Sequence, residues 1–112
     1  MSQITTHVLD TSLGKPAQGI SIFLEEKSAE IWKTLGSGTT NSDGRISDLL
    51  SKEKKLSFGT YRLVFKVRPY FDEMKVKSFY PEITIEFEII SEAHYHVPLL
   101  LNPFGFSTYR GS

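Results

Sequence analysis

The sequence HYHVPLLLNPFGFSTYRGS, residues 94–112, has the pattern of a β-hairpin: an alternating strand, a break at an Asn-Pro pair and a second short strand. Side chains two residues apart in a strand share a face, so His94 and His96 are expected to project together, opposite Tyr95. The hairpin runs directly into the tetrapeptide Tyr-Arg-Gly-Ser, residues 109–112. Chain ends are usually frayed, whereas an aromatic ring, a cation and a hydroxyl after a patterned strand indicate part of a site.

The same period of two recurs upstream of this hairpin, and helical periodicity is scarce. The alternating stretches are residues 4–10, 20–25, 31–40, 60–68 and 83–89. Each has one apolar and one polar face, as expected where two sheets pack around a shared core. One short helix is predicted over residues 70–77, after Pro69, because proline suits the first helical turn. About eight short strands separated by turn signals therefore predict an all-β, two-sheet sandwich.

Size and composition restrict the class of protein. The 112 residues are expected to form a single domain, residues 1–112. Thirteen acidic residues balance thirteen basic ones, which argues against nucleic-acid and membrane-surface partners. The chain has no cysteine, no signal-peptide pattern at its start, and no apolar run near the roughly 18 residues of a membrane helix. We predict a cytoplasmic protein.

Three side chains are candidates for acid–base chemistry and oxyanion binding. His7 and His96 fall on the outward faces of their predicted strands, and Arg45 follows the turn signal of residues 41–44. An imidazole, whose pKa lies near ~6.5, is the natural proton acceptor at neutral pH. A guanidinium can hold a developing oxyanion with a bidentate fork.

Two other kinds of site compete with this interpretation. The spacing of His94 and His96, with His7 as a third ligand, is compatible with zinc, but no carboxylate suited to orienting these imidazoles is evident beside them. A serine triad is disfavoured because Ser112 is terminal and no Gly-x-Ser-x-Gly turn exists. We therefore predict a site without metal or cofactor.

Four motifs carry a resemblance to a known family. They are TTHVLD at residues 5–10, TNSDGR at 40–45, HVPLLL at 96–101 and YRGS at 109–112. Their order and spacing resemble the 5-hydroxyisourate hydrolases, the transthyretin-like proteins of urate breakdown in purine catabolism. The chain departs from the family pattern around one turn, at Asn102, Phe104 and Phe106.

The resemblance implies a fold, an assembly and a reaction. The fold is a transthyretin-like sandwich of two four-stranded sheets and one short helix. The assembly is a homotetramer with active sites between dimers. The reaction is hydrolysis of a cyclic amide C–N bond, which opens the ring of 5-hydroxyisourate to 2-oxo-4-hydroxy-4-carboxy-5-ureidoimidazoline. The family's functional positions fall on His7, Arg45, His96, Tyr109, Arg110, Gly111 and Ser112.

The resemblance also implies a role for each of these positions. His7 and His96 activate water and transfer protons, and Arg45 holds the carbonyls of the substrate. The tetrapeptide 109–112 shapes the pocket and orients the substrate or its water. Which histidine is the base stays open, as does any role of His94.

Two rival functions remain at this point. Transthyretin itself carries thyroid hormone in the corresponding channel, but a channel for an iodinated aromatic is expected to be more apolar than one lined by His7 and His96. The other rival is an adhesive sandwich domain without chemistry. Such domains usually belong to secreted multi-domain chains, and this sequence has neither a signal peptide nor a linker.

Overall fold

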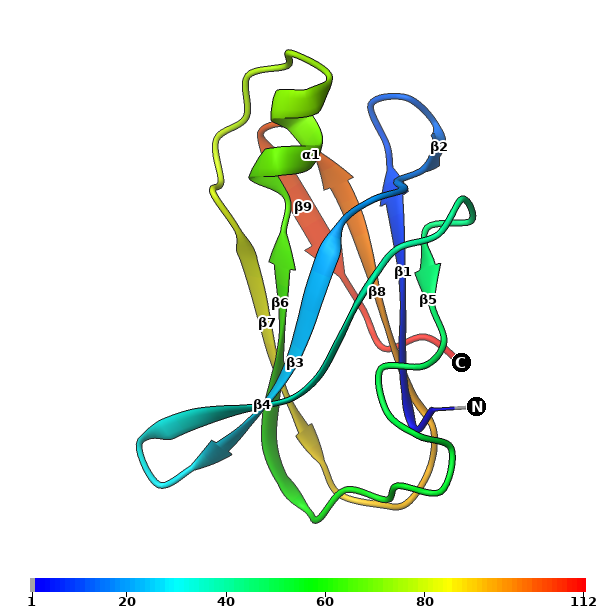
Figure 1. The fold of residues 1–112 in the computed structure, drawn as a ribbon, viewed down its shortest axis with the longest axis vertical. Coiled ribbons are helices and arrows are strands. Elements are labelled where there is room, and N and C mark those ends of the chain that lie inside the picture. Colours follow the sequence, from blue (N-terminus) through cyan, green and yellow to red (C-terminus); the bar gives the residue numbers. More distant parts are fainter. Residues whose placement is uncertain (1) are drawn as a thin grey trace.

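The computed structural model describes residues 2–112, and its regular elements are strands apart from one short helix (Figure 1). The elements are β1 (Ile4–Asp10), β2 (Lys15–Pro16), β3 (Ser21–Ser28), β4 (Ile31–Thr39), β5 (Arg45–Ile46), β6 (Gly59–Lys66), α1 (Arg68–Glu73), β7 (Ile83–Ile89), β8 (Tyr95–Asn102) and β9 (Gly105–Thr108). No helix within residues 2–112 is long and apolar enough to cross a membrane.

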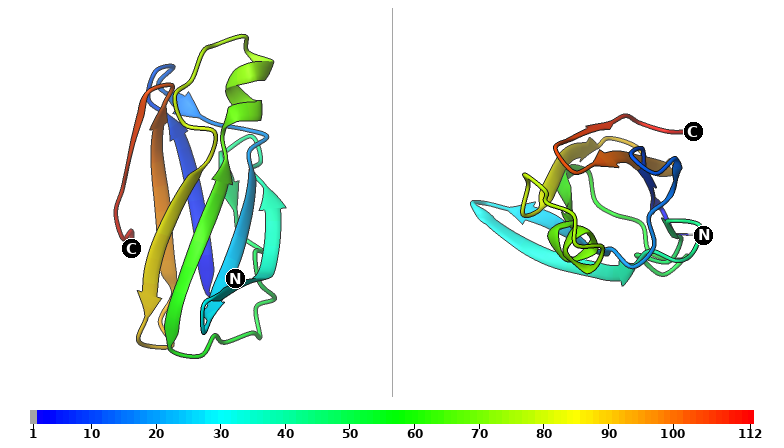
Figure 2. Two further views of the ribbon diagram at one scale, coloured as in Figure 1. Left: turned by 90° about the vertical axis from the view of Figure 1, so that its left-hand side faces the viewer. Right: turned by 90° about the horizontal axis from the view of Figure 1, so that it is seen from above.

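The strands form two sheets that face each other across a shared core (Figure 2). The first sheet has the order β2-β1-β8-β9, with β5 also paired to β1. The second has the order β4-β3-β6-β7. The pairing of β1 with β8 is parallel and the others are antiparallel. The predicted all-β sandwich is confirmed.

The core is built from the apolar faces that the alternation predicts. Tyr61, Leu63 and Phe65 on β6 are fully buried, because successive side chains of a strand point to opposite faces and this face meets the other sheet. Other fully buried core residues are Ile4 and Val8 on β1, Ile22 and Leu24 on β3, and Leu99 and Leu101 on β8. Burial of an aliphatic side chain of this size stabilises the fold by about 1.5–3 kcal/mol.

Two short strands depart from the sequence prediction. β8 occupies one edge of β1, so β5 and β2 share the other edge: β5 pairs with the middle of β1 and β2 with its end. The first sheet therefore has five strands, where the resemblance implies four. Two-residue strands carry no detectable alternation, which explains why the sequence did not predict them.

The helix lies earlier than predicted. It spans Arg68–Glu73 instead of residues 70–77, with Pro69 in its first turn. Lys75 adopts a left-handed conformation with φ of 58°, which ends the helix because this conformation cannot continue a right-handed helix. Phe71 anchors the helix in the core, and the Tyr70 hydroxyl donates a 2.7 Å hydrogen bond to the buried Asp10 carboxylate of β1.

Candidate active site

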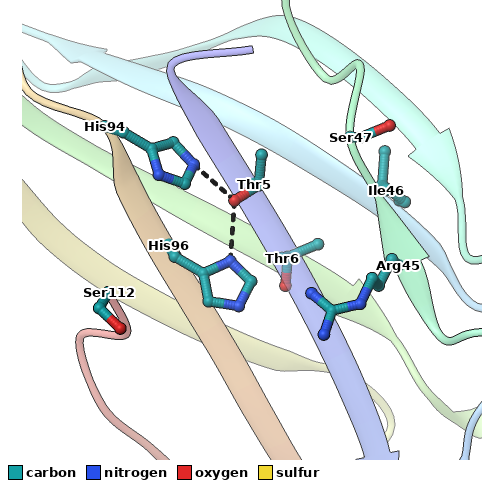
Figure 3. Close-up of a pocket in the computed structure, with 8 residues that line it drawn as sticks. All are labelled: Thr5, Thr6, Arg45, Ile46, Ser47, His94, His96 and Ser112. Atoms are coloured by element: carbon teal, nitrogen blue, oxygen red, sulfur yellow. Dashed lines mark hydrogen bonds between the residues drawn. The ribbon is translucent and has the colours of Figure 1, made fainter. Parts of the chain in front are cut away.

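A cavity of about 260 Å³ lies on the outward face of the first sheet (Figure 3). It gathers side chains from β1, from β5 and the residue after it, from the start of β8 and the residue before it, and from the end of the chain. Its lining residues are Thr5, Thr6, Arg45, Ile46, Ser47, His94, His96 and Ser112. The lining side chains lie together because β1 is between β5 and β8 in the sheet.

His96 is held on one side by a threonine of the neighbouring strand. The parallel register places Thr5 opposite His96, and the Thr5 Oγ1 lies 2.8 Å from His96 Nδ1. The same oxygen lies 2.7 Å from His94 Nε2. The two imidazoles project together as predicted, with their ring centroids 6.2 Å apart in a stacked arrangement.

His96 is held on its other side by the end of the chain. Gly111 forms an isolated bridge with His96, in which the Gly111 amide donates a 2.8 Å hydrogen bond to the His96 carbonyl oxygen. A Cβ atom at Gly111 would lie only 2.6 Å from His96 Cδ2. Only glycine therefore allows this close approach, which brings Ser112 to the cavity.

Arg45 is delivered by the tight turn of residues 41–44. The Asn41 side-chain oxygen accepts hydrogen bonds from the amides of Asp43 and Arg45, at 2.9 and 3.1 Å. Gly44 has a φ of +72°, and a Cβ there would collide with the Val8 carbonyl oxygen. The Gly44 carbonyl accepts a 2.7 Å hydrogen bond from the Val8 amide, which fixes the turn against β1 and places Arg45 opposite His7.

The surroundings of the two imidazoles favour their neutral forms. Burial and the positive charge of Arg45 lower the pKa of His96, and His94 and His7 act in the same direction. Burial and Arg45 likewise lower the pKa of His7, against a smaller opposing effect of Asp43. Since both values fall below the ordinary ~6.5 of histidine, both rings are neutral and able to accept a proton at neutral pH.

The structure brings together part of the predicted site. Arg45, His96 and Ser112 line the cavity, and Gly111 contacts the ring of His96. His7 does not line the cavity, but it pairs with Arg45 in the sheet and is close enough for its charge to affect His96.

The first half of the terminal tetrapeptide lies elsewhere. Tyr109 and Arg110 line a separate, mostly apolar groove of about 310 Å³ between β7 and β8. The Arg110 guanidinium lies 4.1 Å from the ring centroid of Tyr95, on the opposite face of β8 from the imidazoles. It also donates a 3.4 Å hydrogen bond to the His94 carbonyl oxygen. Within one chain, the tetrapeptide is thus divided between two surfaces.

Four lining residues, Thr5, Thr6, Ile46 and Ser47, were not predicted as part of the site, and the role of His94 was left open. Thr5 is separated from its partner His96 by 91 positions in sequence. Its only local signal is that it shares a strand face with His7. Within residues 2–112, no three His, Cys, Asp or Glu side chains are grouped so as to hold a metal ion.

The comparisons with known proteins agree with the architecture and with the family resemblance. Residues 4–111 match the model of the HIUase/Transthyretin family. The 5-hydroxyisourate hydrolase of Salmonella typhimurium is 47% identical over 110 residues, covering 97% of this chain and 80% of the relative. The structure of the Klebsiella pneumoniae 5-hydroxyisourate hydrolase superposes with a TM-score of 0.86 at 35% identity, over 97% of this chain and 92% of that one. Sea bream transthyretin in complex with thyroxine gives a TM-score of 0.91 at 26% identity, over 98% and 95% of the two chains.

Proposed function

The chain belongs to the HIUase/transthyretin family, and on this premise we propose that it is a 5-hydroxyisourate hydrolase. The product of the ring opening is 2-oxo-4-hydroxy-4-carboxy-5-ureidoimidazoline. The observation that carries the proposal is the meeting of Arg45, His96 and Ser112, from three distant parts of the sequence, in one cavity. The hydrolases of Salmonella and Klebsiella, at 47% and 35% identity, support the choice of substrate.

The chemistry follows from the groups around the cavity. A neutral imidazole takes a proton from water, and the water oxygen attacks a carbonyl carbon of the substrate ring. Arg45 stabilises the oxyanion that forms on the carbonyl oxygen. The ring C–N bond then breaks, and the imidazolium returns its proton to the leaving nitrogen. One positioned base contributes about 10²–10⁴-fold and one oxyanion donor about 10²–10³-fold.

Of the two predicted bases, His96 is favoured because it lines the cavity, whereas His7, the strand partner of Arg45, does not. His7 then supports the reaction through its position beside the guanidinium. Ser112, which lines the cavity, orients the substrate or its water. Ser112 is exposed and terminal, so the position of its hydroxyl depends on the hydrogen bond that anchors Gly111 to His96.

We also propose that the chain is a single domain and assembles as a homotetramer, with each site covered by another subunit. His94, Arg45 and Ser112 are exposed on an outward sheet face, where a second copy would exclude water and strengthen electrostatic interactions inside the site. In such an assembly Tyr109 and Arg110 would complete a site through the neighbouring copy. Light scattering measures the oligomeric state as the protein is diluted, and the decay assay measures activity in the same samples. Loss of the tetramer is expected to lower activity.

Transport of thyroid hormone is a second candidate, favoured by the TM-score of 0.91 to sea bream transthyretin in complex with thyroxine. The cavity argues against it, because imidazoles, hydroxyls and a guanidinium line the surface that would face an iodinated aromatic ring. These groups suit a polar heterocycle with several carbonyls.

The deciding experiment follows the ultraviolet absorbance of freshly made 5-hydroxyisourate. We expect this protein to accelerate the decay, and the variant Lys33→Ala, exposed on β4 of the other sheet, to do so equally. Decay at the rate of buffer alone, together with calorimetric binding of thyroxine, would overturn the hydrolase proposal in favour of the carrier.

A further inference from the structure

The Thr5 hydroxyl occupies an unusual position between two histidines. Its oxygen lies 2.7 Å from His94 Nε2 and 2.8 Å from His96 Nδ1, and the residue is only 7% exposed. His94 is exposed and His96 is half-buried. The three groups form a short hydrogen-bonded chain that runs from the exposed imidazole of His94 through Thr5 to the half-buried imidazole of His96 (Figure 3).

The number of protons restricts how this chain can be arranged. A threonine hydroxyl has one proton to donate and two lone pairs to accept with, so it cannot donate to both imidazoles. If it donates to His96 Nδ1, the neutral ring carries its proton on Nε2. If instead His96 donates from Nδ1 to Thr5, the Nε2 atom keeps a free lone pair. Only the second arrangement leaves Nε2 able to take a proton.

Arg45 decides between the two arrangements. The second ring nitrogen of His96 is directed toward the Arg45 guanidinium (Figure 3), whose positive charge already acts on this ring. A guanidinium is a pure donor, so it attracts a lone pair and repels an N–H dipole aimed at it. The lone pair of His96 therefore belongs on Nε2 and the proton on Nδ1.

We propose that Thr5 is a positioning residue that holds His96 as the Nδ1–H tautomer, with its Nε2 lone pair facing the cavity. Thr5 accepts from His96 Nδ1 and donates its own proton to His94 Nε2, which gives the exposed histidine a role. The tautomer of an imidazole is set by the hydrogen bond that its other nitrogen makes. The catalytic meaning of this arrangement rests on the proposed hydrolase function, whereas the tautomer itself does not.

The direct test is ¹⁵N NMR of the protein labelled at histidine, at pH 8, where the neutral rings dominate. The His96 signals are identified by their loss in His96→Gln. We expect wild-type His96 to show a protonated Nδ1 and an unprotonated Nε2. A wild-type ring with its proton on Nε2 overturns the proposal, whatever the variants do.

Two variants separate positioning from packing. Thr5→Val keeps the shape but removes the hydroxyl, and Thr5→Ser keeps the hydroxyl. Loss of one hydrogen bond changes an equilibrium by about twofold to tenfold. We expect Thr5→Val to shift the tautomer ratio and lower kcat by about this factor with KM little changed, and Thr5→Ser to restore both. Equal tautomer ratios in the Val and Ser variants would contradict the role of the hydroxyl.

The two proposals fail separately in these measurements. A wild-type protein with the expected tautomer that does not accelerate decay of 5-hydroxyisourate refutes the hydrolase and leaves the positioning by Thr5 intact. An active protein whose His96 carries its proton on Nε2 refutes the positioning and leaves the hydrolase intact. The wild-type spectrum decides the tautomer even if Thr5→Val does not fold.

Discussion

Replacing Gly111 by alanine should lower activity strongly while leaving the fold almost unchanged. The new Cβ would lie 2.6 Å from His96 Cδ2, 3.3 Å from His96 Cγ and 3.4 Å from Pro98 Cγ. Carbon atoms pack best at roughly 3.5–4.0 Å, so the imidazole or the chain end must move by about 1 Å. A misplacement of about 1 Å at a catalytic group costs on the order of 10²-fold in rate.

The expected loss of stability is small by comparison. If the chain end moves away, the fold loses the hydrogen bond from the Gly111 amide to the His96 carbonyl, which contributes about 1 kcal/mol. Residues at a chain end make few other contacts. Thermal unfolding should therefore shift by only a few degrees, since about 1 kcal/mol corresponds to roughly 4–8 °C in a domain near this size.

The assay compares the rate of 5-hydroxyisourate decay with the unfolding temperature in the same preparations. Gly59→Ala is the matched control, because nothing lies within 4 Å of a Cβ at Gly59 and its φ is not positive. We expect Gly59→Ala to retain wild-type kcat/KM and Gly111→Ala to lose about 10²-fold. Wild-type kcat/KM in Gly111→Ala would refute the reasoning that Gly111 fixes the position of His96.

Three further changes probe the same cavity. His96→Ala should stay folded, because the side chain points out of the core, and should lose about 10²–10⁴-fold in turnover by decay assay; an undiminished rate removes His96 from the mechanism. Activity should fall as the pH drops below ~6.5 through the lowered pKa values of His7 and His96, so a flat rate from about pH 5 to 8 excludes a histidine base. The free energy of unfolding should fall over the same pH range, because His7 and His96 have the higher pKa in the unfolded chain, which then binds more protons. Chemical denaturation at each pH measures this free energy. Residues added after Ser112 should lower kcat/KM more than the unfolding temperature, because that end of the chain lines the cavity; a fully active extended protein contradicts this placement.

The local pattern of the sequence determined the strands and their faces. The alternation in residues 60–68 placed Tyr61, Leu63 and Phe65 in the core, and the two-residue spacing put His94 and His96 on one face. These predictions succeeded because the side-chain period of a strand is two, whatever lies beside it. The helix was placed less well, since its end depends on the left-handed conformation of Lys75, which a short segment does not reveal.

Only the tertiary structure decided which strands are neighbours, and with that the composition of the site. The contact of Thr5 with His96 spans 91 positions in sequence and exists because β1 and β8 pair in parallel. The pairing of β5 with β1 brings Arg45 beside His7. The bridge of Gly111 to His96 then divides the terminal tetrapeptide, leaving Ser112 at the cavity and Tyr109 outside it. A sequence period fixes the face on which a side chain lies, whereas the packing of the whole chain fixes its neighbours.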